Sequence, residues 1–222
     1  MSSLFFILQG QNTMTNKPNP SSTILYSSDD DMQSHAVRFI MAEKNIERKV
    51  VSLDAEKMPE EILERSPGQA IPTLFDRGIV LYDLSVIMEY LDERFPFPPL
   101  LPVDPIEKSE KRLLIFRFTR SVDSWFEQVA IIETGEEKEA IAARKTLKSN
   151  LIELVPLFEY KPFFKSDNMT IVDACLAVLL WRLKKLDINL GAPGKAVTDY
   201  ANRLFARDSF KESLTDCEKE FN

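Results

Sequence analysis

Residues 71–82 read IPTLFDRGIVLY, and this stretch decides how the first half of the chain folds. Two apolar runs, 71–75 and 79–82, flank Asp76, Arg77 and Gly78, a pattern that predicts a β-hairpin. A doubly wound sheet joins its strands by crossover helices, not by a tight turn. The hairpin, opened by a proline, therefore argues against that fold.

Upstream of the hairpin, short apolar runs alternate with helical patterns. These patterns predict a strand over 23–27, a helix over 32–44, a strand over 49–53 and a short helix over 59–65. A further helix is expected over 84–95, directly after the hairpin. The resulting order, βαβαββα, is typical of a thioredoxin-like domain, which we place at residues 23–101.

The second half of the chain predicts an all-helical domain over 107–220. Prolines at 96, 98, 99, 102 and 105 separate it from the first half, because each proline lacks a backbone donor and restricts the preceding residue. An apolar stripe predicts one long core-facing helix through Leu114, Phe118, Val122, Trp125, Val129 and Ile132. Further helices are expected over 140–157, 171–186, 195–206 and 209–220.

Composition excludes several classes of function. The net charge of -7 and the pI of about 5.0 would repel a phosphate backbone, so we expect no direct binding of nucleic acid. The two cysteines, Cys175 and Cys217, stand far apart, and His35 is the only histidine, so the spacing suggests neither a disulfide framework nor a metal site. A reducing cytoplasm is the expected location.

The first 22 residues are expected to be a disordered tail. Residues 9–22 are rich in Gln, Asn, Ser and Pro and cannot bury enough surface to order themselves, and translation could start at Met1 or at Met14. The apolar run 4–8 is too short to cross a bilayer and has no cleavage site after it. We therefore expect neither a membrane anchor nor an export signal.

Three short motifs resemble the glutathione transferase superfamily. They are Ile71-Pro72-Thr73-Leu74, the helix 87–91 (IMEYL), and 170–173 (TIVD) at the start of another helix. In the last motif Thr170 and Asp173 can form a capping box, worth about 1 kcal/mol. The resemblance implies a thioredoxin-like domain followed by a helical domain, with Pro72 as a cis-proline that shapes the glutathione site and with the backbone of Ile71 pairing with the tripeptide.

A second set of motifs, in order along almost the whole chain, is similar to the stringent starvation protein A family. It comprises 34–38 (SHAVR), 42–44 (AEK), 88–99 (MEYLDERFPFPP), 181–183 (WRL) and 207–210 (RDSF). The resemblance implies a bacterial homodimer that needs no cofactor, has no transferase activity and associates with RNA polymerase as a transcription regulator under starvation and acid stress. Which polymerase subunit or sigma factor it contacts stays open.

The position that activates the glutathione thiol in active relatives corresponds to Asp31. A carboxylate there would repel a thiolate and, when ionised, has no proton to donate, so it raises the thiol pKa. Tyr26 and Ser34 are the alternative activators, although Tyr26 is better explained as sheet packing and Ser34 as a residue on the surface of its helix.

The second glutathione anchor of the family, an acidic residue followed by serine, reads Asp83-Leu84 here. Loss of that hydrogen bond to a charged group costs about 1.5 to 3 kcal/mol. Asp83 can instead cap the helix that follows. With Tyr26, Asp31, Ile71 and Pro72, these residues would form a vestigial glutathione site, and the two losses favour a binding scaffold over an enzyme.

The turn Pro96-Phe97-Pro98 corresponds to a proline-histidine-proline pocket that the resemblance implicates in polymerase contact. We predict that it binds the partner through apolar stacking, because Phe replaces His; the alternative is a stiff linker with Phe97 tucked inward. Nearby acids, Asp92, Glu93, Asp104 and Glu107, could steer a basic surface toward it.

Three hypotheses follow. The first is the polymerase-associated regulator, the second a glutathione-dependent transferase that uses Tyr26 or Ser34, and the third a subunit that works only in a heterodimer. His35 is expected at a surface or half-buried position, Cys175 in the core, and Cys217 exposed.

Overall fold

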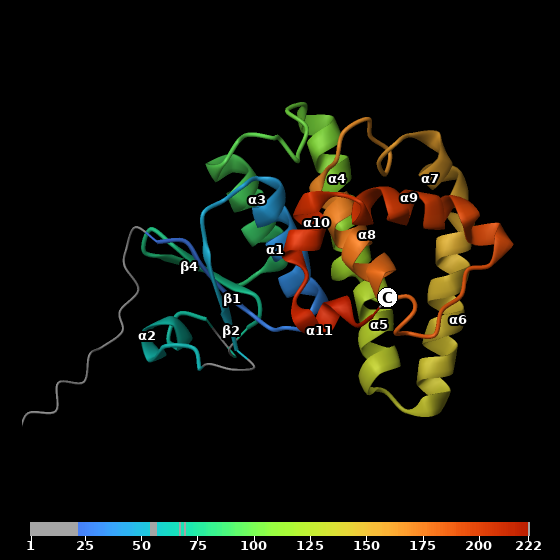
Figure 1. The fold of residues 1–222 in the computed structure, drawn as a ribbon, viewed down its shortest axis with the longest axis horizontal. Helices are drawn as coiled ribbons and strands as arrows, with labels where there is room; N and C mark the ends of the chain where they lie inside the picture. The colour runs from blue at the N-terminus through green and yellow to red at the C-terminus, as the bar shows by residue number, and fades with distance from the viewer. Residues whose placement is uncertain (1–21, 54–56, 67, 69, 222) are drawn as a thin grey trace, which may run out of the picture.

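The computed structural model describes residues 22–53, 57–66, 68 and 70–221, and Figure 1 shows a small sheet domain beside a larger helical one. The sheet has the strand order β2-β1-β3-β4, with β1 parallel to β2 and antiparallel to β3. β3 and β4 form the predicted hairpin, with Asp76 paired to Ile79. The strands are β1 (Ile24–Ser27), β2 (Lys49–Ser52), β3 (Thr73–Asp76) and β4 (Ile79–Leu81).

Helices cover both faces of this sheet. α1 (Met32–Glu43) and α3 (Leu84–Arg94) lie between the sheet and the helical domain, and α2 (Glu60–Leu63) lies on the opposite face (Figure 1). Successive side chains of a strand point to opposite faces, so Leu25 joins the large core with α1 and α3, whereas Tyr26 joins a smaller cluster with residues of α2. The thioredoxin-like arrangement was predicted from the hairpin.

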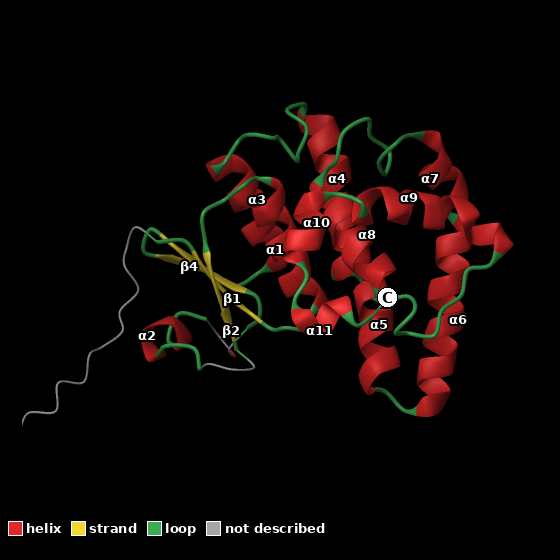
Figure 2. Ribbon diagram, in the orientation of Figure 1, coloured by secondary structure: helices red, strands yellow, loops and turns green. Residues whose placement is uncertain are grey.

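The second half of the described chain is helical apart from one isolated bridge, as Figure 2 shows. Its core is centred on α8, in which ten of the eleven residues, from Ile171 to Leu180, are buried. The elements are α4 (Pro105–Thr119), α5 (Trp125–Thr134), α6 (Glu137–Glu153), α7 (Val155–Tyr160), α8 (Ile171–Trp181), η2 (Ala192–Gly194), α9 (Lys195–Phe205), α10 (Asp208–Ser213) and α11 (Asp216–Lys219).

The capping box at the start of α8 is present and lies in the core. The backbone N–H of Thr170 donates to Oδ2 of Asp173 at 2.7 Å, and the Thr170 hydroxyl donates to the same oxygen at 2.8 Å. The other oxygen accepts from the Tyr200 hydroxyl at 2.6 Å and from the backbone N–H of Phe164 at 2.8 Å. Burial raises the pKa of Asp173, and these bonds oppose the rise.

The prediction of one long helix through Val122 is wrong. The first helix, α4, ends at Thr119, and α5 begins at Trp125. Between them Asp123 adopts a positive φ of 62°, and the Ser124 side chain caps α5 by accepting the backbone N–H of Glu127. Val122 is 92% exposed, so its match to the apolar stripe was accidental. The stripe continues on both sides because α4 and α5 each face the same core.

Three other helices are shorter than predicted. The helix expected over 140–157 divides at Leu154, next to the proline in the first turn of α7, and the one expected over 171–186 ends at Trp181 in a series of turns. The helix expected over 209–220 divides at Leu214, whose backbone is extended. Apolar periodicity continues through such breaks, so it could not locate them.

A cluster of buried charges joins the two domains. Glu218 of α11 accepts hydrogen bonds from Arg38 of α1 at 2.8 Å and from Arg182, just after α8, at 2.6 Å. His35 of α1 lies against the same carboxylate, with Nδ1 3.2 Å from Oε1. Arg182, His35 and Glu218 have no exposed surface. Sequence reasoning placed His35 at or near the surface, which is wrong because α1 is enclosed by the sheet, α8 and α10.

The contacts of His35 are compatible with a neutral ring that carries its proton on Nε2. The Ser213 hydroxyl donates to Phe210 O at 2.7 Å, so it accepts from His35 Nε2 at 3.1 Å, while Arg182 Nη1 lies 3.1 Å from Nδ1. Burial lowers the pKa of His35 to about 4, opposed by Glu218 and helped by the two arginines. Burial raises the pKa of Glu218, but contacts with His35, Arg38 and Arg182 bring it down to about 2.

Stability should therefore fall as the pH is lowered through the window set by His35. The unfolded chain binds a proton near the usual pKa of 6.5, whereas the folded chain does so only near 4, so acid favours unfolding between these values. We expect the free energy of unfolding to fall by roughly 1.5 kcal/mol from this residue between pH 6.5 and about 5. Urea unfolding across this range measures it.

The matched control is His35→Gln, which keeps hydrogen-bonding capacity and removes the titration. Its unfolding free energy should depend less on pH than that of the wild type in the same range. Equal slopes for the two proteins would show that His35 titrates alike in the folded and unfolded states, contrary to this account.

Candidate functional site

Asp31, at the expected thiol-activating position, is used as a helix cap. Its Oδ2 accepts the backbone N–H of Ser34 at 2.6 Å and so occupies part of the N-terminus of α1. In the absence of that carboxylate, the free N–H groups of a helix N-terminus would favour an anion. The negative side chain would therefore repel a thiolate at this end of the helix.

The two alternative activators are buried. Tyr26 is only 3% exposed and packs in the apolar cluster on the α2 face of the sheet. Ser34 has no exposed surface, and its Oγ accepts the backbone N–H of Ser28 at 3.2 Å. The prediction that Ser34 lies on the helix surface is wrong for the same reason as for His35. Neither hydroxyl faces solvent, where a thiol substrate would arrive.

The residues expected to offer backbone groups to glutathione lie directly before β3. The Ile71–Pro72 peptide bond is cis, as the resemblance implies, and Ile71 is exposed. Behind it, the Thr73 hydroxyl donates to Ala70 O at 2.6 Å and lies 3.0 Å from Ser66 Oγ.

The second anchor also serves as a cap. Asp83 Oδ1 accepts the backbone N–H groups of Ser85 at 3.1 Å and Val86 at 3.2 Å, and its Oδ2 lies 2.8 Å from Arg120 Nη1. Partial burial raises the pKa of Asp83, but the hydrogen bonds from Ser85 and Val86 and the charge of Arg120 outweigh this effect. The pKa of Asp83 is therefore lower than its usual value. Leu84, which replaces the family's serine, is buried in the core.

Neither cysteine has the lowered pKa of a reactive thiol. Cys175 is buried, as expected, and burial raises the pKa of its thiol to about 12. Cys217 is exposed, and slight burial and the charge of Asp30 raise its pKa as well. Within the same residues, no three His, Cys, Asp or Glu side chains are placed to hold a metal ion, and none of the helices is both long and apolar enough to cross a bilayer.

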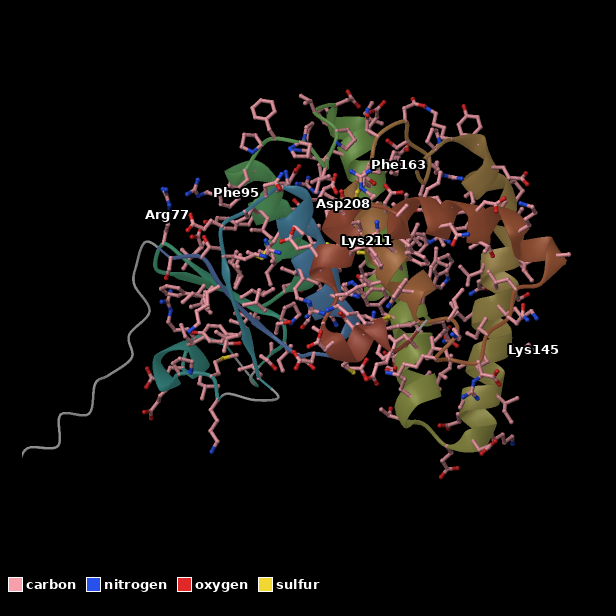
Figure 3. All side chains as sticks on the ribbon, in the orientation of Figure 1. Arg77, Phe95, Lys145, Phe163, Asp208 and Lys211 are labelled. Atoms are coloured by element: carbon pink, nitrogen blue, oxygen red, sulfur yellow. The ribbon has the colours of Figure 1, made fainter. Side chains whose placement is uncertain are left out.

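The turn at residues 96–98 presents an aromatic side chain to solvent. Phe97 is 82% exposed, so the alternative in which it tucks inward is wrong. The Phe97–Pro98 peptide bond is cis. The turn leaves α3 at Phe95, which Figure 3 labels.

A buried ion pair holds this turn from below. The Lys44 ammonium donates to Phe95 O at 2.7 Å and to Pro98 O at 2.6 Å, and it pairs with Asp92 at 2.7 Å. The Lys44 side chain has no exposed surface. An ammonium has three N–H groups, so all three have acceptors here.

Asp92 belongs to this support and not to the solvent-exposed acids with which sequence reasoning grouped it. Its two oxygens accept the backbone N–H groups of Leu100 at 2.8 Å and Leu101 at 3.0 Å. Sequence analysis missed the roles of both Lys44 and Asp92, although each lies inside a stretch that carries the family resemblance. A lysine and an aspartate 48 positions apart give no sign of pairing.

Two more apolar side chains are exposed close to Phe97 in sequence. Val103 is 92% exposed and Ile106 is 73% exposed, on either side of Asp104, which caps α4 by accepting the backbone N–H groups of Ile106 and Glu107 at 3.0 Å. Such exposed apolar side chains often mark a surface that binds another protein.

Comparison with known proteins agrees with this architecture. The family model for the N-terminal domain of glutathione S-transferase matches residues 33–94, and the model for its C-terminal domain matches residues 108–208. Among solved structures, rice GST1 in complex with glutathione superposes with a TM-score of 0.77 at 20% identity, covering 90% of this chain and 95% of that one. Ure2p in complex with glutathione gives 0.76 at 14%, covering 89% and 95%. These structures establish the fold.

Sequence relatives are more specific. A stringent starvation protein A homolog of Coxiella burnetii is 43% identical over 197 residues, which cover 88% of this chain and 93% of the relative. The homolog of Haemophilus influenzae is 40% identical over 191 residues, covering 86% and 89%. The maleylacetoacetate isomerase of Rattus norvegicus is 24% identical over 86% of this chain and 91% of its own. The chain therefore belongs to the stringent starvation protein A family, which is built on the glutathione S-transferase fold.

Proposed function

We propose that this protein is a cytoplasmic, RNA polymerase-associated transcription regulator of the bacterial starvation and acid stress response, built on a non-catalytic glutathione-transferase scaffold. The observation that carries the proposal is the Phe97 side chain, 82% exposed on a turn that the buried Lys44–Asp92 pair supports. The partner is the polymerase holoenzyme, contacted through a core subunit or a sigma factor.

The geometry of the turn suits a binding surface. Exposed aromatic side chains are frequent hot spots, because they bury a large apolar area when a partner covers them. A turn whose backbone is already fixed loses little conformational freedom on binding, so more of the contact energy appears as affinity. Lys44 and Asp92 fix the backbone on both sides of Phe97 without using its side chain.

The same geometry weighs against a transferase. Asp31 and Asp83 are both engaged as helix caps, and Leu84 is part of the core. An enzyme would also need a hydroxyl or thiol facing the cleft, and Tyr26 and Ser34 are buried. These positions support a scaffold from which the thiol chemistry has been lost.

We further propose that the protein is a homodimer through α3 and α4. Four apolar side chains on these helices and the preceding strand end are exposed, namely Tyr82, Val86, Leu113 and Phe116. Ion pairs tie the two helices together within the same region: Arg112 lies 2.5 Å from Glu89, and Arg120 lies 2.8 Å from Asp83. The helices thus form one rigid apolar surface with polar edges, as stable subunit contacts require.

Replacing Phe97 by alanine should weaken retention of RNA polymerase on the immobilised protein. Removal of a hot-spot aromatic costs about 2 kcal/mol or more, which corresponds to about 30-fold in affinity. The measurement is a titration of purified polymerase holoenzyme, with and without sigma factor, against each immobilised variant. Val122→Ala, which trims an equally exposed apolar side chain elsewhere, should change nothing.

Lys44→Met tests whether the support matters, because it leaves Phe97 in place and removes the donor to both carbonyls. It should weaken polymerase binding as well. Unchanged binding by Phe97→Ala would refute the assignment of the site. Absence of any polymerase binding, together with glutathione binding by calorimetry and turnover that Tyr26→Phe abolishes, would favour the transferase.

Replacing Phe116 by aspartate should convert the dimer to a monomer, because a charge would be buried without a partner at the proposed contact. Light scattering of the purified chain measures the mass directly. Ile141→Asp, at an exposed apolar position on α6, is the matched control and should stay dimeric. A wild-type chain that is monomeric would instead favour the obligate heterodimer.

A further inference from the structure

A pocket of about 540 Å³ lies in the helical domain, between residues 180–191 and α9. In Figure 1 these segments form the orange and red-orange part of the domain, beyond α8. The volume falls in the usual range for small-molecule sites. None of the vestigial glutathione residues lines it, and neither does the turn that carries Phe97.

The floor of the pocket is apolar. Ile188, Leu190, Val197 and Ala201 line it and are buried in the rest of the core. Phe205 forms one wall, its ring packed edge to face against Trp181 with centroids 4.9 Å apart. A ligand that fills this floor would bring an aliphatic or aromatic group, because the side chains of these five residues are apolar.

Two glycines shape the wall next to this floor. Gly191 has φ 61° and ψ -162°, a conformation open essentially to glycine alone. A Cβ on Gly194 would stand 2.3 Å from Leu190 Cβ, so only glycine lets η2 approach the floor this closely. The Asn189 side chain accepts the backbone N–H of Gly191 at 2.9 Å and fixes the loop further. The pocket is therefore formed before any ligand arrives.

The rim carries charges of both signs without partners in the described residues. Lys184 and Asp187 are exposed at the mouth, and neither makes an ion pair or a side-chain hydrogen bond with another described residue. The Asn202 side-chain amide, on the α9 side, is likewise unengaged within that part of the chain. Neighbouring lysines behave differently, since Lys185 pairs with Asp30 at 2.6 Å and Lys195 with Asp199 at 2.5 Å.

We propose that this pocket binds a zwitterionic α-amino acid with an apolar side chain. The side chain of the ligand would fill the floor beside Phe205, its carboxylate would pair with Lys184, and its ammonium would pair with Asp187. Asn202 can donate to the carboxylate or accept from the ammonium, because an amide does both. The proposal goes beyond the polymerase contact, and the two sites share no residue.

Each part of this ligand makes a separate contribution. Loss of a hydrogen bond to a charged group costs about tenfold or more in affinity. L-phenylalanine or L-leucine should therefore bind at least about tenfold more tightly than 3-phenylpropanoate, which lacks the ammonium, and than phenethylamine, which lacks the carboxylate. Glycine, which lacks the apolar group, should bind weakest.

The test is a titration of the full ¹⁵N-labelled chain with each of these five compounds, followed by NMR shifts of residues 180–205. Saturable shifts confined to the pocket are expected for the two apolar amino acids. No saturable shift up to their solubility limits would overturn the proposal. Equal affinity for 3-phenylpropanoate would also overturn it, because the pocket would then recognise an anion alone.

Two variants give a crossed pattern that a purely structural role could not produce. Lys184→Ala should weaken phenylalanine and 3-phenylpropanoate but not phenethylamine. Asp187→Asn, chosen because asparagine tolerates the positive φ of 57° at this position, should weaken phenylalanine and phenethylamine but not 3-phenylpropanoate. The control Lys145→Ala, on α6 (Figure 3), should leave all affinities unchanged. If Lys184→Ala behaves like this control, the proposed contact is wrong.

Discussion

The arrangement of the two domains depends on the carboxylate of Glu218. It is fully buried between Arg38 and Arg182, which come from different domains, and each arginine also donates to backbone carbonyls around it. Removing one member of such a cluster would leave uncompensated buried charge, which costs about 3 to 5 kcal/mol. The cluster therefore restricts how α1 can sit against α8 far more sharply than apolar packing would. Because α1 also carries Lys44 at its C-terminal end, the same helix fixes the position of the Phe97 turn.

The elements of the sheet domain and their order along the chain could be predicted because they depend on local signals. A run of turn residues between two apolar runs defines the hairpin at 71–82, whereas the pairing of β3 with β1 joins segments far apart in sequence. The breaks in the helical domain could not be predicted from periodicity, since Val122 continues the apolar stripe although it lies in a loop. The residues of the candidate site likewise fall into those that local sequence reveals and those that it does not. Phe97 stands out beside two prolines, whereas Lys44, Asp92 and Glu218 gain their roles only from partners far away in sequence.

Two acidic residues at the positions expected for glutathione binding have the same structural role here. A carboxylate at an N-cap accepts the first backbone N–H groups of its helix and is stabilised by the positive end of the helix dipole. Asp31 does this for α1 and Asp83 for α3. The two residues thereby stabilise the N-termini of α1 and α3 and occupy backbone donors that an anionic ligand could otherwise use.

The contacts that hold the Phe97 turn fix the conformation of its backbone and do not depend on which side chain stands at position 97. Lys44 and Asp92 contact only backbone atoms of residues 95, 98, 100 and 101, and no part of the support touches the side chain at 97. The requirements on positions 44 and 92 are coupled through their ion pair, and arginine could not replace the lysine, because a planar guanidinium presents its donors in a different geometry. Position 97 is under no such constraint. A substitution at position 97 would thus change the side chain offered to solvent, while the support of the loop that presents it stays the same.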